Sequence, residues 1–325
     1  MLDSGGEVMR ALAITGPTAS GKTALSLAVA ERIPSEIISC DSMQIYRGMD
    51  IGTAKATAEE REAVRHHLID FLSPTESYSV EAYRTDALAA VRDVVNRGKL
   101  PIFVGGTGLY VDSLMRGSAD EAPGGDEEYR ERLLSGIKSE EDKTALWERL
   151  REVDPESAEK THKNNVKRVI RALEIFDKTG VPKSEHDKRT RLIAPEIDIK
   201  MITIDFHQRE NLYSRVDERV DIMMADGLFD EVCSLYSAGL LPSEATSAQA
   251  IGYKEIISHL RGECSLAEAV EEIKLASRRY AKRQLTWFRH KEAVRIYRDS
   301  EDGVMKKAED FVNEALDVAM NLLKI

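Results

Sequence analysis

The chain is poor in cysteine and has no long hydrophobic run. Its 325 residues include three cysteines, Cys40, Cys233 and Cys264, which lie far apart in the sequence. This spacing excludes the paired patterns of zinc sites and redox motifs, and the odd number argues against a disulfide framework. The apolar runs are shorter than a bilayer span, and the N-terminal residues are too polar for a signal peptide. We therefore expect a cytoplasmic protein that does not enter a membrane.

Positive charge is also scarce over the chain as a whole. There are 46 Lys and Arg against 57 Asp and Glu, which gives a net charge of −11. This balance argues against blanket, sequence-independent binding of nucleic acid. The segment from Lys274 to Arg298 is different, because it has nine basic residues and one acidic residue, Glu292. An acidic protein with one basic segment indicates a polyanionic partner held at a defined place.

Short runs of β-branched and apolar residues predict the core of the fold. Buried strands are expected at residues 10–15, 36–40, 67–71, 100–104, 200–205 and 293–297. Helical patterns are expected at residues 21–32, 80–97, 109–115, 211–225, 229–237, 266–290 and 304–323. Most strands alternate with helices, which predicts an α/β fold with a doubly wound parallel sheet.

Residues 117–195 lack any clear strand. They contain amphipathic helical patterns at residues 127–138, 140–152 and 165–178. We interpret them as a small helical domain inserted between two parts of the α/β core, residues 1–116 and 196–325. The borders contain Pro and Gly and suit hinges. We expect the whole protein to be a monomer.

The segment GPTASGKT matches the complete phosphate-loop (P-loop) pattern. It follows an apolar strand and precedes a helix, which is the context that the pattern requires. Backbone N–H groups and a helix N-terminus would surround one anion, Lys22 would add a charge, and the Thr23 hydroxyl would bind Mg²⁺. The residues expected to bind a diphosphate or triphosphate are Gly16, Pro17, Thr18, Ala19, Ser20, Gly21, Lys22 and Thr23. Alone, the motif favours an ATP-using kinase, for which only Asp41 and Asp205 are candidate Mg²⁺ carboxylates.

Further blocks narrow this choice. They read CDSMQIYRGMDIGTAK, HHLID, LPIFVGGTGLY, KRVIRALEIF, SRVDERVDIMMADGL, AIGYKE and AKRQLTWFR, in this order. Together with GPTASGKT, they make the chain resemble the tRNA dimethylallyltransferases over most of its length. The resemblance implies transfer of a dimethylallyl group from dimethylallyl diphosphate to N6 of adenosine 37, in the anticodon stem-loop of tRNA. The P-loop would then hold the diphosphate that leaves, with Mg²⁺ as cofactor.

The resemblance also implies roles for particular residues. Asp41 would be the general base, and Arg215 would bind the diphosphate opposite the P-loop, so the catalytic set is Asp41, Lys22, Thr23 and Arg215. The residues expected to contact tRNA are Asp41, Ser42, Met43, Gln44, Thr107, Arg130, Lys167, Arg168, Arg171, Gln249, Gly252 and Lys254. Periodicity alone places Arg215 and Arg219 on a solvated helix face, and the resemblance changes this interpretation for Arg215 only.

Three further interpretations come from the residues themselves. Lys274, Arg278, Lys282 and Arg289 share one helix face and suit phosphate contact. Tyr280, Trp287 and Phe288 gather on the other face, and we expect the aromatic pair Trp287 and Phe288 to pack into the core rather than to stack on bases. His66 and His67 are not expected to bind metal, because adjacent side chains diverge and no further ligand stands at a suitable spacing.

Three alternatives to tRNA prenylation remain open at this point. An adenylate isopentenyltransferase would prenylate free adenine nucleotides. A P-loop small-molecule kinase would consume ATP without any nucleic acid. A non-enzymatic RNA-binding module is the third, although the P-loop followed by Asp41 disfavours it.

Overall fold

A computed structural model describes residues 8–116 and 125–324 of the chain. The chain divides into two compact units. The first runs up to Leu114 and resumes at Ile197, and the second is Met115–Glu196. These limits differ by one or two residues from those expected. Most of the expected hinge at residues 118–126 lies outside the described part of the chain.

The first unit is built on a six-stranded sheet in the order β3-β2-β4-β1-β5-β6, and every strand pair is parallel. The strands are β1 (Met9–Thr15), β2 (Ser35–Ser39), β3 (His66–His67), β4 (Leu100–Gly105), β5 (Ile197–Asp205) and β6 (Val294–Tyr297). The α/β fold with a parallel sheet is therefore confirmed. Because all the strands run the same way, their carboxyl ends meet at one edge, where such folds bind ligands.

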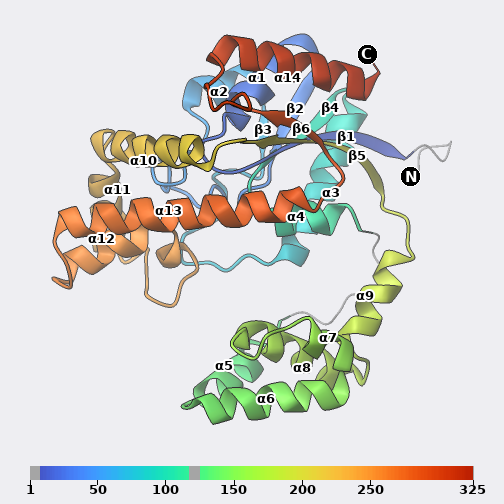
Figure 1. Cartoon of the computed structure of the whole chain (residues 1–325), viewed down its shortest axis with the longest axis vertical. Helices are drawn as coiled ribbons and strands as arrows, with labels where there is room; N and C mark the ends of the chain where they lie inside the picture. The colour runs from blue at the N-terminus through green and yellow to red at the C-terminus, as the bar shows by residue number, and fades with distance from the viewer. Residues whose placement is uncertain (1–7, 117–124, 325) are drawn as a thin grey trace. The chain divides into compact units, whose positions relative to one another are not determined.

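Helices pack on both faces of this sheet (Figure 1). The helices described in this unit are α1 (Lys22–Arg32), α2 (Ala58–Ala63), α3 (Val80–Asn96), α4 (Gly108–Leu114), α10 (Arg209–Ala225), α11 (Leu228–Ser237), α12 (Tyr253–Leu260), α13 (Leu266–Arg289) and α14 (Ala308–Leu323). Residues of β1 and β5 such as Leu12, Ile14 and Ile204 pack against Leu25 of α1 and Phe311 of α14. No helix in the described residues is both long and apolar enough to cross a membrane.

The prediction of a strand at residues 67–71 is largely wrong. The ladder of β3 stops at His67, because Leu68 and Asp70 adopt left-handed backbone angles, with φ of 55° and 60°. Such angles cannot continue a strand. Short elements without a strong pattern were not anticipated: α2, the 3₁₀ turn Ser247–Gln249, and α12.

The second unit is helical, as expected. Its helices are α5 (Glu127–Ser135), α6 (Glu140–Val153), α7 (Pro155–Glu159), α8 (Val166–Thr179) and α9 (Lys183–Arg191). A small core of Leu150, Val169 and Leu173 is completed by Trp147. The Trp147 indole N–H donates to the carbonyl oxygen of Thr161 at 2.7 Å, which ties α6 to the turn after α7.

A buried carboxylate joins three segments at one edge of the sheet. Glu36 of β2 is 1% exposed. It accepts hydrogen bonds from His67 of β3 at 2.7 Å, from Arg97 at 2.7 and 3.0 Å, and from Lys99 at 3.0 Å. Burial would raise the pKa of Glu36, but its hydrogen bonds to Arg97, His67 and Lys99 outweigh this and lower the pKa to about 2. Glu36 therefore stabilises the fold as a carboxylate.

Replacing Glu36 by Gln is expected to lower the free energy of unfolding by about 1–3 kcal/mol at neutral pH, because charge-assisted hydrogen bonds are lost. The folded pKa lies below the ordinary value of 4.5, so this contribution is complete above pH 4.5 and is lost as the pH falls toward 2. Urea unfolding at several pH values measures it. The exposed Glu31→Gln variant is the control. A gap between wild type and Glu36→Gln that does not narrow with acid would contradict the assignment.

Candidate functional site

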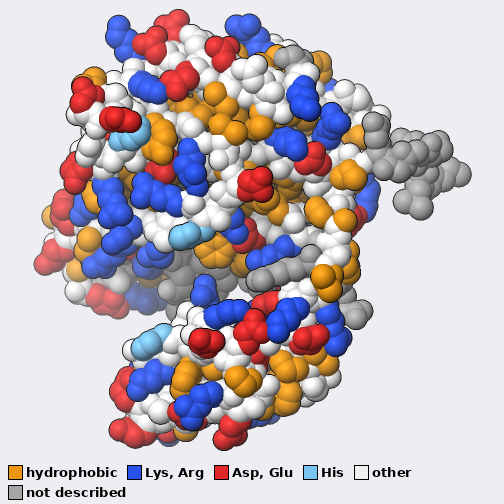
Figure 2. Space-filling view, turned by 45° about the vertical axis from the view of Figure 1, so that its right-hand side comes forward, with side chains coloured by type: hydrophobic (Ala, Val, Ile, Leu, Met, Phe, Trp, Pro, Cys, Tyr) orange, Lys and Arg blue, Asp and Glu red, His pale blue; other side chains and the backbone are white. Residues whose placement is uncertain are grey.

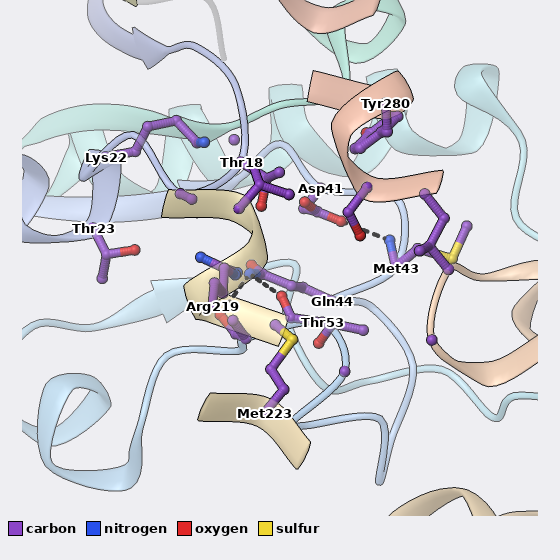
Figure 3. Close-up of a pocket in the computed structure, with 18 of the residues that line it drawn as sticks. Thr18, Lys22, Thr23, Asp41, Met43, Gln44, Thr53, Arg219, Met223 and Tyr280 are labelled. Carbon is purple, nitrogen blue, oxygen red and sulfur yellow. Dashed lines mark hydrogen bonds between the residues drawn. The ribbon is translucent and has the colours of Figure 1, made fainter. Parts of the chain in front are cut away.

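A cavity of 670 Å³ lies in the first unit at the carboxyl edge of the sheet. Residues of the P-loop, which follows β1, line it from Thr18 to Thr23. Asp41, Ser42, Met43 and Gln44, which follow β2, line it as well, and α10 and α13 contribute further walls (Figure 3). The fold thus brings together two segments that the sequence singled out separately.

The P-loop curls tightly because of its first glycine. Gly16 has a φ of +138°, and a Cβ atom there would lie 2.7 Å from the carbonyl oxygen of Ile204 in β5. No described side chain caps the N-terminus of α1, and its first turn contains no acidic residue. The first N–H groups of this helix are therefore free to bind an anion in the cavity.

Lys22 lies folded back over the loop that precedes it (Figure 3). Its Nζ donates to the carbonyl oxygens of Gly16 at 3.1 Å and Pro17 at 2.7 Å. Burial, followed by repulsion from Arg219, lowers the pKa of Lys22 to about 7, and only the nearby Asp41 opposes this shift. An anion bound here would favour the charged form of Lys22.

Two arginines on one face of α10 point toward the same end of the cavity. The Nε of Arg215 donates to the carbonyl oxygen of Ala19 at 2.8 Å, which attaches α10 to the P-loop. Arg219, one turn later, also lines the cavity, and no hydrogen bond or ion pair joins it to another described residue. Burial lowers the pKa of Arg219, Asp41 raises it, and Arg215 lowers it further.

The expectation that Arg219 faces solvent was therefore wrong. The signal that could have identified it is its spacing, because a residue four positions after Arg215 lies on the same helix face. Asp217, between these two arginines on α10, forms an ion pair with Arg278 of α13 at 2.6 Å.

Asp41 stands half-buried at the end of β2 with its carboxylate facing the cavity. One carboxylate oxygen accepts the backbone N–H of Met43 at 2.9 Å (Figure 3). Thr107, which follows β4, supports this turn, since its Oγ1 accepts the N–H of Ser42 at 3.1 Å. Tyr280 of α13 lies beside it, and burial together with Asp41 raises the pKa of Tyr280. Tyr280 also lines the cavity.

A close backbone contact sets the position of Asp41. At the end of β4, a Cβ atom on Gly105 would lie 2.3 Å from the carbonyl oxygen of Cys40, so only glycine fits. The next carbonyl, of Gly106, accepts from the Gln284 amide at 3.0 Å. Gln284 in turn accepts the N–H of Thr18 at 2.9 Å. This buried side chain of α13 connects the end of β4 with the P-loop. The sequence analysis missed this role of Gln284, and the only signal for it was a polar residue on an apolar helix face.

Gln44 lines the cavity, but its amide is already occupied. Its Nε2 donates to the carbonyl oxygens of Thr53 at 3.2 Å and Ala54 at 3.1 Å, and its Oε1 accepts from Ser39 at 3.2 Å. These contacts leave its amide donors directed at the chain rather than at a nucleic acid base. Whether Gln44 touches tRNA stays a prediction.

The remaining expected tRNA contacts are divided between the two units. Gln249 and Gly252 line the main cavity, whereas Lys254 lines a second cavity of 360 Å³ that Gln249 also borders. Arg130, Lys167, Arg168 and Arg171 belong to the second unit. Arg130 and Arg171 both pair with Glu174, a fully buried carboxylate, at 2.9 and 3.0 Å. Lys167 and Arg168 are exposed.

The basic face expected on α13 is mostly neutralised within the chain. Lys274 pairs with Asp221 at 2.7 Å, and Arg289 pairs with the buried Asp205 at 2.9 Å. Arg278 is held by Asp217, as described above. Lys282 stays exposed. In the space-filling view, Lys and Arg side chains have Asp and Glu side chains among them (Figure 2). The local charge of this segment therefore overstates the charge available to a partner.

The cavity has a polar end and an apolar wall. Away from the P-loop, it is lined by a set of aliphatic and thioether side chains: Met43, Val220, Met223, Leu228, Ile251 and Ile273. Phosphate-binding groups and an apolar wall in one cavity suit a ligand that has both an anionic group and a hydrocarbon chain.

Few side chains near the cavity could bind a metal ion. The described residues contain no group of three or more His, Cys, Asp or Glu able to hold one. Asp205 is bound by Arg289, and the ring of His67 contacts Glu36. The exposed Thr23 side chain lines the cavity beside the helix N-terminus. One hydroxyl, with phosphate oxygens and water, fits Mg²⁺, which binds through few protein ligands.

A parallel α/β sheet, a P-loop and a carboxylate over one amphipathic cavity define an enzyme that acts on a phosphorylated apolar substrate. The model of the IPP transferase family matches residues 44–291, and the chain belongs to this family.

Similar proteins cover nearly the whole chain. A tRNA dimethylallyltransferase of Bacillus cereus is 48% identical over 92% of this chain and 93% of its own length. One of Caldanaerobacter subterraneus is 47% identical over 85% and 87%. The structure of a tRNA isopentenylpyrophosphate transferase of Staphylococcus epidermidis has a TM-score of 0.69 at 40% identity, covering 97% of this chain and 99% of that one. A eukaryotic dimethylallyltransferase described as acting on tRNA has a TM-score of 0.74 at 31% identity, covering 86% and 70%.

Replacing Gly105 by Ala is expected to destabilise the protein by at least about 2 kcal/mol, because the new methyl group would overlap the Cys40 carbonyl oxygen. The clash is with backbone, which cannot rotate away. Thermal unfolding measures the effect. Gly136→Ala is the control, since a Cβ there meets nothing closer than 3.5 Å. Equal melting temperatures for the two variants would contradict the close contact.

Proposed function

We propose that the chain transfers a dimethylallyl group from dimethylallyl diphosphate to N6 of adenosine 37, next to the anticodon of tRNA. The observation that carries this proposal is that the P-loop and Asp41 face one cavity with an apolar wall. The names of the similar proteins support tRNA as the acceptor. We place the reaction in the cytoplasm, where tRNA is used.

The diphosphate would occupy the P-loop end of the cavity. The helix N-terminus, Lys22, Arg215 and Arg219 supply positive charge there, and this charge stabilises the diphosphate as the C–O bond breaks. Arg215 and Arg219 suit phosphate oxygens because guanidinium groups present fixed pairs of donors. The dimethylallyl chain would lie along the apolar wall.

Asp41 would act on the acceptor. The N6 amine is a weak nucleophile because its lone pair is delocalised into the adenine ring. As the C–N bond forms, Asp41 accepts a proton from N6, and the diphosphate leaves with the electrons of the C–O bond. The base must leave the stack to reach the cavity, where Tyr280 offers an aromatic surface beside Asp41.

Mg²⁺ is the cofactor that we propose, held by the Thr23 hydroxyl and the diphosphate. When bound, it would neutralise part of the negative charge on the leaving group. Lys22 and Arg215, rather than the metal, would orient the diphosphate.

The function is tested by incubating the protein with labelled dimethylallyl diphosphate, Mg²⁺ and either tRNA, AMP or ATP. We expect label on tRNA only. Asp41→Asn keeps an acceptor for the Met43 N–H but removes the base, so turnover should fall by about a hundredfold or more while tRNA affinity is retained. Glu62→Gln, which removes an exposed carboxylate, is the control.

Other outcomes have distinct meanings. Label on AMP or ATP alone would identify an adenylate isopentenyltransferase. ATP consumption without prenyl transfer would identify a kinase. RNA binding without either reaction would leave only a binding module. Normal turnover by Asp41→Asn would remove Asp41 from the role of base.

Donor binding is expected to depend on the charge of Lys22. Burial and repulsion from Arg219 lower the pKa of Lys22 to about 7, so donor affinity should weaken as the pH rises above 7. Because Arg219 lowers this pKa, Arg219→Gln should weaken binding overall and move the midpoint of the pH dependence upward. Calorimetric titration with dimethylallyl diphosphate from pH 6 to pH 9 measures both effects.

Dimethylallyl diphosphate also changes its own ionisation over this pH range. This change affects wild type and Arg219→Gln equally, so it cancels when their affinities are compared at the same pH. Lys22→Arg, which stays charged, is the control and should remove the midpoint near neutrality. An identical midpoint in wild type and Arg219→Gln would show that Arg219 does not act on Lys22.

A further inference from the structure

A carboxylate outside the cavity organises one of its walls. Glu231 of α11 accepts three successive backbone N–H groups, from Asp50 and Ile51 at 2.8 Å and from Gly52 at 3.1 Å. Successive N–H groups that converge in this way form an anion-binding concavity. Here the chain fills it with its own carboxylate.

A fourth donor completes this arrangement. The Tyr253 hydroxyl of α12 donates to Glu231 at 2.5 Å, and burial together with Glu231 raises the pKa of Tyr253. The Tyr253 ring also lies close to the loop, since a Cβ on Gly52 would be 2.5 Å from it. Glu231 therefore joins residues 50–52 to both α11 and α12.

The same loop holds the residues that follow Asp41. Its carbonyl oxygens at Thr53 and Ala54 accept both donors of the Gln44 amide. Gln44 is three residues after Asp41, and the loop at Gly52, Thr53 and Ala54 lines the cavity. Residues 50–54 thus connect two sets of hydrogen bonds: Glu231 holds the N–H groups at 50–52, and Gln44, beside the turn that presents Asp41, binds the carbonyl oxygens at 53 and 54.

The phosphate end of the cavity is supported independently. Gln284 and Arg215 hold the P-loop at Thr18 and Ala19, and in the described part of the chain neither side chain is hydrogen-bonded to residues 50–54. No hydrogen bond joins Glu231 to the P-loop in the described residues. Changes at Glu231 should therefore reach the acceptor side of the site and spare the phosphate side.

We propose that Glu231 is a positioning residue for the acceptor side of the reaction, which acts through residues 50–54 and Gln44 to hold the Asp41 turn and its adenosine in place. The proposal rests on the proposed function. It predicts a separation of two properties: the rate of prenyl transfer depends on Glu231, and the affinity for diphosphate does not.

The test is Glu231→Gln, in which an NH₂ group replaces one of the oxygens that receive N–H and O–H donors. We expect kcat on an anticodon stem-loop RNA to fall about tenfold or more, because misplaced reacting groups lose rate steeply. The Kd of inorganic diphosphate should stay within about twofold of wild type. Hydrogen exchange should quicken at the amides of Asp50, Ile51 and Gly52.

Asp230→Asn is the matched control. Asp230 is the neighbouring acidic residue in the first turn of α11, and it is exposed. Asp230→Asn removes a negative charge from the first turn of α11, as Glu231→Gln does, but Asp230 makes none of the hydrogen bonds to residues 50–52. The kcat and amide exchange of Asp230→Asn should therefore match those of wild type. Tyr253→Phe, which loses a single bond to Glu231, should show the same pattern more weakly and also serves if Glu231→Gln fails to fold.

Two results would overturn the role of Glu231. One is a normal kcat in Glu231→Gln despite faster exchange of the loop amides. The other is a parallel loss of kcat and diphosphate affinity, which a general structural defect would produce. Failure of the unchanged protein to prenylate any RNA would overturn the proposed function itself.

Discussion

The site depends on the confinement of several positive charges at one end of one cavity. Lys22, Arg215 and Arg219 face the same space, and Asp41 is the carboxylate that opposes their repulsion. Burial and repulsion make the charged form of Lys22 costly, so its pKa falls toward neutrality. The hydrogen bonds from Lys22 Nζ to the carbonyl oxygens of Gly16 and Pro17 offset part of this cost. An incoming dianion would relieve it more completely, which suits a site built to bind and stabilise a departing diphosphate.

The parallel sheet provides the frame for this arrangement. The strands β1, β2 and β4 end at one edge, where they place the P-loop, the Asp41 turn and Gly105 side by side. Separate supports then hold each part. Gln284 from α13 and Arg215 from α10 fix the P-loop, whereas Thr107 and the loop held by Glu231 flank the Asp41 turn. In the proposed reaction, this division would separate the binding of the leaving group from the activation of the acceptor.

Local patterns predicted much of this site. The P-loop is a contiguous motif whose backbone function depends on glycine spacing, and strand–helix alternation placed Asp41 at a strand end near it. Patterns failed where partners come from distant segments. The basic face of α13 was misjudged because Asp217, Asp221 and Asp205 neutralise it from α10 and β5. The residues 67–71 have strand-like composition, yet two left-handed backbone angles end the ladder at His67.

The sequence alone determined the fold class and the P-loop, because each depends on periodicity or on neighbours within a few residues, and it placed Asp41 directly after an expected strand. Only the tertiary structure decided which charged side chains are free and which are paired. It placed Arg219 in the cavity, turned the amide of Gln44 toward residues 53 and 54, and joined Glu231 to a loop 180 residues away. The physical reason is that the free energy of a charge depends on burial and partners, and both are properties of the packed chain.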